Sequence, residues 1–318
     1  MPWRLWRRKR NSASQADGLE APQAHAEEAP VAQATDAAAV PDAGGALPHT
    51  ADLYLRNWAF IAPALQNRLA NTTLLTAGAG LGSVIAVLAA RTGVQRFILA
   101  DGDVVEESNL NRQAFTRVHL GQNKAEATAA IIADIQPNAN IEIVPRYLDA
   151  TDCAALVPRA DIILNTIDFD SLAFLELNRV ARAEGKPVLF PLNPAWMGTL
   201  MVFTPDGISL DEFLGIEDPT QPQSAQDITL RFAQRIFAGL PGGIPDSIKP
   251  LLPLYREQDP TTWKGDPQLG VTAYLTAALA VRALVALVAH EPVRVAPQVI
   301  TADAFTEVAP LPVPIRQS

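Results

Sequence analysis

The sequence predicts an α/β fold in which a doubly wound, mainly parallel sheet carries helices on both faces. An apolar run at Leu74–Thr76 has the length of a buried strand, and a glycine-containing turn follows it. Apolar residues then recur at helical spacing from Ser83 to Arg91, and a second apolar run, Arg96–Ala100, ends on Asp101. Strand, glycine turn, helix, strand and acid is the order of a nucleotide-binding βαβ unit, so we expect a Rossmann-like domain.

The same alternation continues along the chain. Strands are predicted at Ile141–Pro145, Asp161–Thr166, Lys186–Phe190, Gly198–Phe203 and Val299–Phe305, with helices at Lys124–Ile135, Asp149–Leu156 and Leu172–Glu184. Strands that alternate with helices are typical of a parallel sheet covered on both sides.

Composition limits the organisation of the chain. Its 318 residues are 48% hydrophobic, enough for one sizeable core, and the formal charge of −9 argues against a nucleic-acid-binding body. Residues 1–50 begin with a basic stretch, Met1–Arg10, and continue rich in Ala and Pro without periodicity, so we expect a disordered tail. Contact of the basic stretch with an anionic membrane is the less favoured alternative. Residues 51–318 are expected to form one domain, with 209–268 as an insertion or lid.

The glycine turn is a candidate phosphate-binding element. A helix that begins just after it presents free backbone N–H groups and a positive dipole end to phosphate oxygens. Asp101 lies roughly 20 residues beyond the turn, where such folds place the carboxylate that binds the ribose hydroxyls. We therefore expect Gly78, Gly80, Gly82 and Asp101 to contact a nucleotide.

A polar segment follows the second strand and is too rich in charges and amides to be another strand. It contains Asp103, Asn109 and Arg112, and Lys124 begins the next predicted helix. The carboxyl ends of the strands face the ligand crevice in a doubly wound sheet. Arg and Lys side chains there could bind a polyphosphate, and a carboxylate could hold Mg²⁺. A solvated loop with a capping asparagine is the alternative.

These motifs resemble the ThiF/MoeB/HesA family, the relatives of ubiquitin-activating enzymes. The family pattern runs G-x-G-G-L-G-S, then L-V-D-x-D-x-V-x-x-S-N-L-N-R-Q, then G-x-x-K-A. The chain matches it at Gly80–Ser83, Leu99–Asp103, Ser108–Gln113 and Gly121–Ala125. The S-N-L-N-R-Q hexapeptide followed by this lysine is more specific than the glycines. The resemblance covers roughly residues 52–205, with a weaker echo in 269–305.

The resemblance implies adenylation, in which a carboxylate is joined to the α-phosphate of ATP with Mg²⁺ present and pyrophosphate leaves. It assigns the ribose to Asp101, the phosphates to Arg112 and Lys124, and an orienting contact to Asn109. Asp103 is taken as a further cofactor-binding residue.

Two further roles depend on looser matches. Asp168 takes the place of the family's Asp in T-D-N, which helps to hold the metal and the triphosphate, although its neighbours here are Ile167 and Phe169. A cap on the following helix, by Asp168 or Asp170, is the alternative. Arg56 matches a family arginine that reaches a nucleotide bound in the partner subunit, so a homodimer is expected. Its alternative is an ordinary surface arginine.

The sequence differs from the family pattern in three respects. Ala77 and Ala79 occupy the places of the first two family glycines, unless the turn shifts by one residue and uses Gly78 and Gly80. The chain has no C-x-x-C pair, so we expect no zinc. Its single cysteine, Cys153, precedes Asp168 and is expected to be a core residue, which leaves no cysteine for a thioester step.

The later part of the chain is less specific. Asn193–Trp196 is a candidate substrate-facing loop, and a helix is predicted at Ala225–Ala238. Leu269–Ala289 is almost wholly apolar and long enough to span a bilayer. Arg282 interrupts it and the family has a buried helix at this place, so we favour a helix of the core or of a dimer interface.

We therefore expect a soluble, cytoplasmic, homodimeric adenylyltransferase that activates the C-terminus of a small ubiquitin-like protein or peptide. One alternative is a non-catalytic nucleotide-binding scaffold, which the alanines in the turn favour. Another is an NAD-dependent oxidoreductase, which leaves the S-N-L-N-R-Q segment and Lys124 unexplained.

Overall fold

The computed structural model describes residues 53–169, 172–194, 196–218 and 267–302, with single residues and short runs between 224 and 253. The expected tail at 1–50, most of the 209–268 insertion and its predicted helix at Ala225–Ala238 lie outside the described residues, apart from those short runs.

A seven-stranded sheet forms the centre of the fold, in the order β3-β2-β1-β4-β5-β6-β7. Strands β1 to β5 run parallel, and β6 and β7 each run antiparallel to the preceding neighbour. The strands are β1 (Thr73–Ala77), β2 (Arg96–Ala100), β3 (Asn140–Val144), β4 (Ile162–Asn165), β5 (Val188–Leu192), β6 (Gly198–Phe203) and β7 (Ile300–Ala302). The chain winds outward from β1 to β3 and returns to β4. The carboxyl ends of β1 and β4 therefore form the switch point where such sheets bind ligands.

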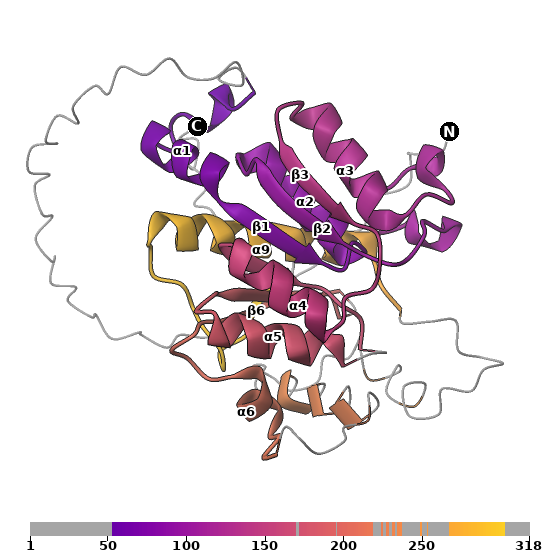
Figure 1. Ribbon diagram of the computed structural model, residues 1–318, viewed down its shortest axis with the longest axis vertical. Coiled ribbons are helices and arrows are strands. Elements are labelled where there is room, and N and C mark those ends of the chain that lie inside the picture. The colour runs from indigo at the N-terminus through magenta and orange to yellow at the C-terminus, as the bar shows by residue number, and fades with distance from the viewer. Residues whose placement is uncertain are drawn as a thin grey trace, which may run out of the picture. The chain divides into compact units, whose positions relative to one another are not determined.

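Helices cover both faces of the sheet, which confirms the predicted fold class (Figure 1). One layer holds α1 (Pro63–Asn71), α2 (Leu81–Thr92), α3 (Lys124–Ile135) and α9 (Gly270–Ala289), and the other holds α4 (Ala150–Leu156), α5 (Ala173–Ala183) and α6 (Leu210–Leu214). Short 3-10 turns lie at Leu55–Asn57, Glu107–Asn109, Arg117–His119 and Val157–Arg159. Neighbouring strand residues face opposite layers, since Leu74 packs with the first layer and Leu75 with the second. Both faces of the sheet are therefore buried, as an apolar parallel sheet requires.

Helix α9 is long and apolar enough to cross a membrane, with a mean hydropathy of 2.0 over its most apolar window. In this fold it packs instead against α2, β5 and β6. Its small residues Ala273, Ala277 and Ala280 are almost fully buried, which lets the helix approach its neighbours closely. It is a core helix, as the sequence predicted.

Candidate functional site

The glycine turn between β1 and α2 depends on close backbone packing. Gly78 has φ +90°, and an added Cβ would lie 2.4 Å from the carbonyl oxygen of Thr166, just beyond β4. Gly82 would place a Cβ 2.7 Å from Thr166 Oγ1 and 2.8 Å from Thr76 Cγ2. Gly78 and Gly82 therefore hold the turn and helix α2 against the sheet. Gly80 occupies the N-cap position of α2, whose first N–H groups face outward from the end of the helix.

The two alanines do not obstruct this turn. Ala77 is the last residue of β1, and both Ala77 and Ala79 have no exposed surface, so their methyl groups point into the protein. The backbone N–H of Ala79 donates to Asp101 Oδ2. The chain therefore forms a tight turn with Gly78 and Gly80 while it carries alanine at the two family glycine positions.

Asp101 lies at the carboxyl end of β2 and is mostly buried. Its Oδ1 accepts from the backbone N–H of Asp103 (2.7 Å), so each carboxylate oxygen receives one backbone donor. Burial raises the pKa of the Asp101 carboxyl above its usual value, although these donors and the charge of Lys124 lower it in part. A carboxylate oxygen can accept two hydrogen bonds, so Asp101 retains acceptor capacity for ribose hydroxyls.

Asp103 is placed to hold Lys124. Lys124 Nζ lies 2.8 Å from Asp103 Oδ2, and the Lys124 side chain is only 10% exposed. The hydroxyl of Tyr147 donates to Asp103 Oδ1. Although burial alone would raise it, the hydrogen bonds from Lys124 and Tyr147 hold the pKa of the Asp103 carboxyl below its usual value. Lys124 is therefore fixed at the carboxyl end of β2 by its ion pair with Asp103, and its Nζ has two further donors for a ligand.

No motif or spacing in the sequence pointed to Tyr147. Its ring lies directly against the backbone of Gly102, where an added Cβ would be 2.6 Å from Cγ of the ring. The only available signal was the glycine between Asp101 and Asp103, because a glycine in such a place often permits a close approach.

Asn109 and Ser83 give the polar segment its shape. Asn109 is buried, and its Oδ1 accepts from the backbone N–H of Glu106 (3.0 Å). The carbonyl oxygen of Asn109 accepts from the N–H groups of Arg112 (3.1 Å) and Gln113 (2.9 Å). Ser83 Oγ donates to the carbonyl oxygen of Gly80 and accepts from the N–H of Ala114, which joins the turn to this segment. Asn109 thus orients Arg112 through the backbone.

Arg112 is half-buried, and three of its hydrogen bonds go to neutral acceptors. Its Nε donates to Gln268 Oε1 (2.8 Å), and its Nη1 donates to the carbonyl oxygen of Ser108 (2.8 Å) and to Asn111 Oδ1 (3.0 Å). Gln268 is a second residue that the sequence did not indicate.

Asp168 lies exposed just beyond the carboxyl end of β4. The N-cap position of α5 belongs to Leu172, so Asp168 does not occupy it. Within the described ranges, no three or more His, Cys, Asp or Glu side chains gather into a metal-binding group. Mg²⁺ usually takes one or two carboxylates together with substrate phosphates and water, so a single carboxylate at this place fits its chemistry.

Arg56 lies away from the glycine turn of its own chain. It belongs to the Leu55–Asn57 turn, which is anchored at the C-terminal end of α2, where Tyr54 donates to the carbonyl oxygen of Ala90 and Asn57 to that of Thr92. The glycine turn lies at the other end of that 12-residue helix. An α-helix of this size is about 18 Å long, so the exposed Arg56 is remote from the phosphate end of α2.

The loop after β5 also carries a notable side chain. Nδ2 of Asn193 is buried without a hydrogen-bond partner among the described residues, and Trp196 is 56% exposed. A buried amide that lacks a partner is rare unless water or a ligand completes it. Asn193–Trp196 therefore remains a candidate for substrate contact.

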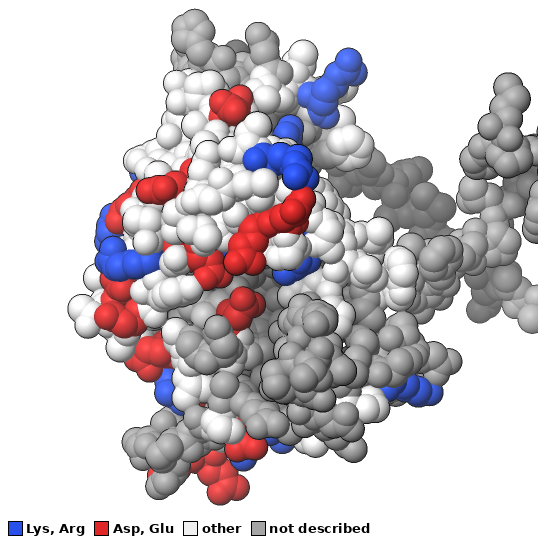
Figure 2. Space-filling view, turned by 90° about the vertical axis from the view of Figure 1, so that its right-hand side faces the viewer, with Lys and Arg blue, Asp and Glu red and all other residues white. Residues whose placement is uncertain are grey.

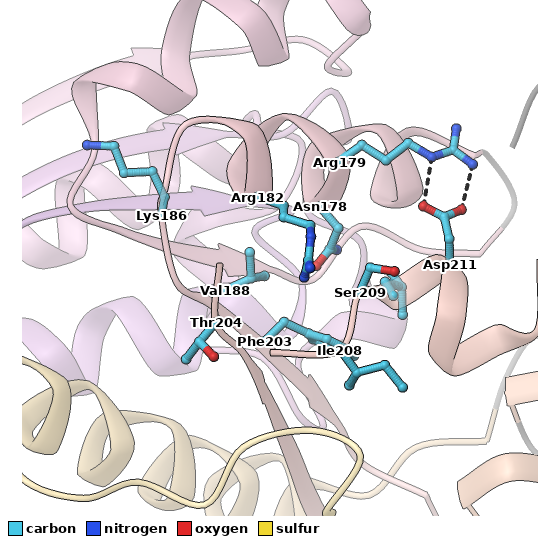
Figure 3. Close-up of a pocket in the computed structure, with 11 residues that line it drawn as sticks. Asn178, Arg179, Arg182, Lys186, Val188, Phe203, Thr204, Ile208, Ser209 and Asp211 are labelled. Atoms are coloured by element: carbon cyan, nitrogen blue, oxygen red, sulfur yellow. Dashed lines mark hydrogen bonds and ion pairs between the residues drawn. The ribbon is translucent and has the colours of Figure 1, made fainter. Parts of the chain in front are cut away.

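A separate pocket lies beside α5 and the amino end of β5 (Figure 3). Figure 3 shows Arg179 making two bonds to the Asp211 carboxylate, at 3.0 and 2.7 Å. Because the amino ends of parallel strands lie opposite the carboxyl ends, this pocket is separate from the site described above.

Figure 2 shows acidic side chains crossing the middle of one face, with Lys and Arg side chains scattered beside them. With a formal charge of −9 for the whole chain, phosphate binding has to come from individually placed cations such as Arg112 and Lys124.

The family model described as the ThiF family matches residues 54–314. The chain belongs to the ThiF family. It is 32% identical over 152 residues to the SAMP-activating enzyme E1 of Haloferax volcanii, a match that covers 46% of this chain and 55% of that protein. It is 30% identical over 142 residues to the sulfur carrier protein ThiS adenylyltransferase of Escherichia coli, which covers 44% and 56% of the two chains.

Among solved structures, this ThiF-family chain is similar to Escherichia coli MccB with AMPCPP and SeMet MccA. The TM-score is 0.55 at 19% identity, covering 77% of this chain and 66% of that one. MccB has also been solved with ATP. At this identity the likeness shows the fold alone. The chain spans about half the length of the two curated relatives above.

Proposed function

We propose that this chain is an ATP-dependent adenylyltransferase that activates a carboxylate as an acyl-adenylate and releases pyrophosphate. The observation that carries the proposal is the meeting of Asp101, Lys124 and the start of α2 at the carboxyl edge of the sheet, with the Arg112 segment hydrogen-bonded to the same turn. The relatives' names favour this reading over an NAD-dependent oxidoreductase, because they are adenylyltransferases and an activating enzyme. The buried methyls of Ala77 and Ala79 remove the observation that favoured a non-catalytic scaffold.

In the proposed reaction, a carboxylate oxygen of the substrate forms a bond to the α-phosphorus of ATP, and the bond from that phosphorus to pyrophosphate breaks. Arg112 and Lys124 neutralise the negative charge on the phosphate oxygens, and the N–H groups at the start of α2 add fixed donors. Asp101 orients the nucleotide through its ribose. When bound, Mg²⁺ would be held by Asp168 and would screen the charge of the triphosphate.

The proposed substrate is the C-terminus of a small ubiquitin-like protein or a peptide. Support comes from relatives named for SAMP and ThiS and from the MccB structure with MccA. We also propose a cytoplasmic homodimer in which Arg56 serves the site of the partner subunit. The remote position of Arg56 from its own glycine turn supports this arrangement.

ATP binding measured by calorimetry with Mg²⁺ tests the proposal. Arg112→Ala and Lys124→Ala should each weaken binding by at least about tenfold, because each removes a charged donor to phosphate. Arg117→Ala is the matched control, since Arg117 lies in the same segment but forms an exposed pair with Glu107. Its ATP affinity should equal that of wild type.

Two results would contradict the proposal. The first is a folded wild-type chain that binds no ATP. The second is ATP affinity equal to that of wild type in all three variants. If ATP binds as expected, pyrophosphate exchange with candidate carboxyl-terminal peptides identifies the acyl substrate.

A further inference from the structure

The stretch Gln268–Gly270, where helix α9 begins, contacts the polar segment at three places. Gln268 Oε1 accepts from Arg112 Nε (2.8 Å), and the carbonyl oxygen of Gln268 accepts from Asn111 Nδ2 (3.3 Å). Gly270 lies so close that an added Cβ would be 2.5 Å from the carbonyl oxygen of Asn111. The two hydrogen bonds join residues 156 and 157 positions apart in the sequence.

These contacts set the direction of the Arg112 guanidinium. Its Nη1 is bonded to Ser108 and Asn111 within the segment, while its Nε is bonded across to Gln268. A guanidinium is planar and its five N–H donors have a fixed geometry, so fixing Nε and Nη1 also fixes the direction of the remaining donors.

The chemistry of the acceptor matters as much as its position. The Gln268 amide oxygen is neutral, so it orients Arg112 without adding a negative charge beside it. Lys124 differs in this respect, because its partner is the Asp103 carboxylate.

We infer that Gln268 is a positioning residue for ATP, which holds the Arg112 guanidinium in the direction required for the phosphates, with Gly270 providing the close approach. The inference rests on the proposed ATP-binding role of Arg112. It adds the start of α9 to a site whose other proposed nucleotide contacts within one chain all lie before residue 170.

Calorimetry with ATP and Mg²⁺ tests the inference on the full chain. Gln268→Ala should weaken ATP binding by about tenfold, the effect expected when a hydrogen bond to a charged group is lost. Gly270→Ala should weaken it in the same direction, because its Cβ forces the two segments apart. Gln268→Ala in an Arg112→Ala background should cause no further loss, since Gln268 acts through that arginine.

Gln268→Glu separates orientation from charge. It keeps an acceptor for Arg112 Nε but places a carboxylate beside the guanidinium, so ATP should bind more weakly than to wild type even though the arginine stays oriented. Gln298→Ala makes the same truncation as Gln268→Ala at an exposed position and should bind ATP like wild type.

The Nε–H resonance of Arg112, assigned by its loss in Arg112→Lys, reports the contact without ATP. It should shift in Gln268→Ala and stay in place in Gln268→Glu. If wild type binds ATP and Gln268→Ala binds it equally well, the positioning role is overturned and the proposed function stands. If wild type binds no ATP, the proposed function fails and the positioning role fails with it.

Discussion

Tyr147 holds the oxygen of Asp103 that Lys124 does not contact. Tyr147→Phe keeps the ring against Gly102 and removes only the hydroxyl. The pKa of Asp103 should then rise toward its ordinary value of 3.8, and ATP affinity should fall severalfold because Lys124 is less firmly placed. A carboxyl ¹³C NMR titration measures the pKa, and calorimetry measures the affinity.

The same substitution carries a prediction for pH. The folded-state pKa of Asp103 is lowered, so its contribution to stability is present above pH 3.8 and is lost as pH falls through the folded-state value. Tyr147→Phe should therefore cost stability at neutral pH and little in strong acid. Tyr274→Phe, at an exposed tyrosine of α9, is the control. It should change neither the pKa of Asp103 nor the stability of the protein. An unchanged Asp103 titration in Tyr147→Phe would contradict this role of the hydroxyl.

Cys153 is a fully buried residue of α4, as expected for a core residue. Burial, with the nearby charges of Glu176, Asp152 and Asp149, raises the pKa of the Cys153 thiol to about 11, against 9.0 for an ordinary thiol. The stability gained from the neutral thiol is complete below pH 9.0 and is lost as pH rises toward 11.

Two measurements check this. Because Cys153 is the only cysteine of the chain, reaction with a thiol reagent should be slow in the native protein and immediate in urea. Cys153→Ala should lose less stability than wild type between pH 9.0 and 11. Fast labelling of the native chain would contradict the burial of this thiol.

At the scale of elements, the turn before α2 offers a comparison of two glycines. Gly78→Ala forces a side chain into a φ of +90° and against the Thr166 carbonyl, so unfolding should require about 3 kcal/mol less free energy. Gly80→Ala meets only the flexible Gln113 amide at 3.3 Å and should cost much less. Urea denaturation of both variants measures the difference, and equal losses would show that the turn is not packed as described.

The sequence predicted elements best where periodicity and caps agree. Helix α3 begins and ends at the predicted Lys124 and Ile135, because Asn123 caps it by accepting from two backbone N–H groups. Strand β5 begins two residues later than predicted, because the N–H of Lys186 closes the C-terminal turn of α5 by donating to Ala181. Pro187 has no N–H with which to continue the ladder in that direction.

The sequence predicted those parts of the site whose residues lie close together along the chain. Asp101, Asp103 and Lys124 meet because strand β2 ends, and helix α3 begins, at the same edge of the sheet. The Asp103–Tyr147 and Arg112–Gln268 contacts join distant segments, and no periodicity or spacing in one sequence specifies which loops touch. The cofactor contact of Asp103 stays a prediction, and the structure adds that this carboxylate is the partner of Lys124.

At the scale of the whole molecule, a homodimer with Arg56 acting in the partner's site predicts complementation between two defective chains. Arg56→Ala and Lys124→Ala should each bind ATP weakly as homodimers. In a heterodimer purified with two different tags, the Arg56→Ala chain keeps its own Lys124 and receives Arg56 from its partner. Calorimetry should then find one tight ATP site for each heterodimer. A heterodimer without a tight site would show that Arg56 acts within its own chain or not at all, and a monomer in sedimentation would exclude the arrangement.

Helix α9 completes the core that helix α2 begins. Ala277, Ala280 and Leu284 of α9 are buried in the same cluster as Val84 and Ile85 of α2. During synthesis, residues 74–168, which carry nearly all of the proposed nucleotide contacts, leave the ribosome long before α9 does. Until Gly270–Ala289 has emerged, the face of α2 that packs on α9 has no permanent cover. The nascent chain is therefore expected to depend on chaperones at that stage, and a fragment that ends before Gly270 should aggregate rather than bind nucleotide.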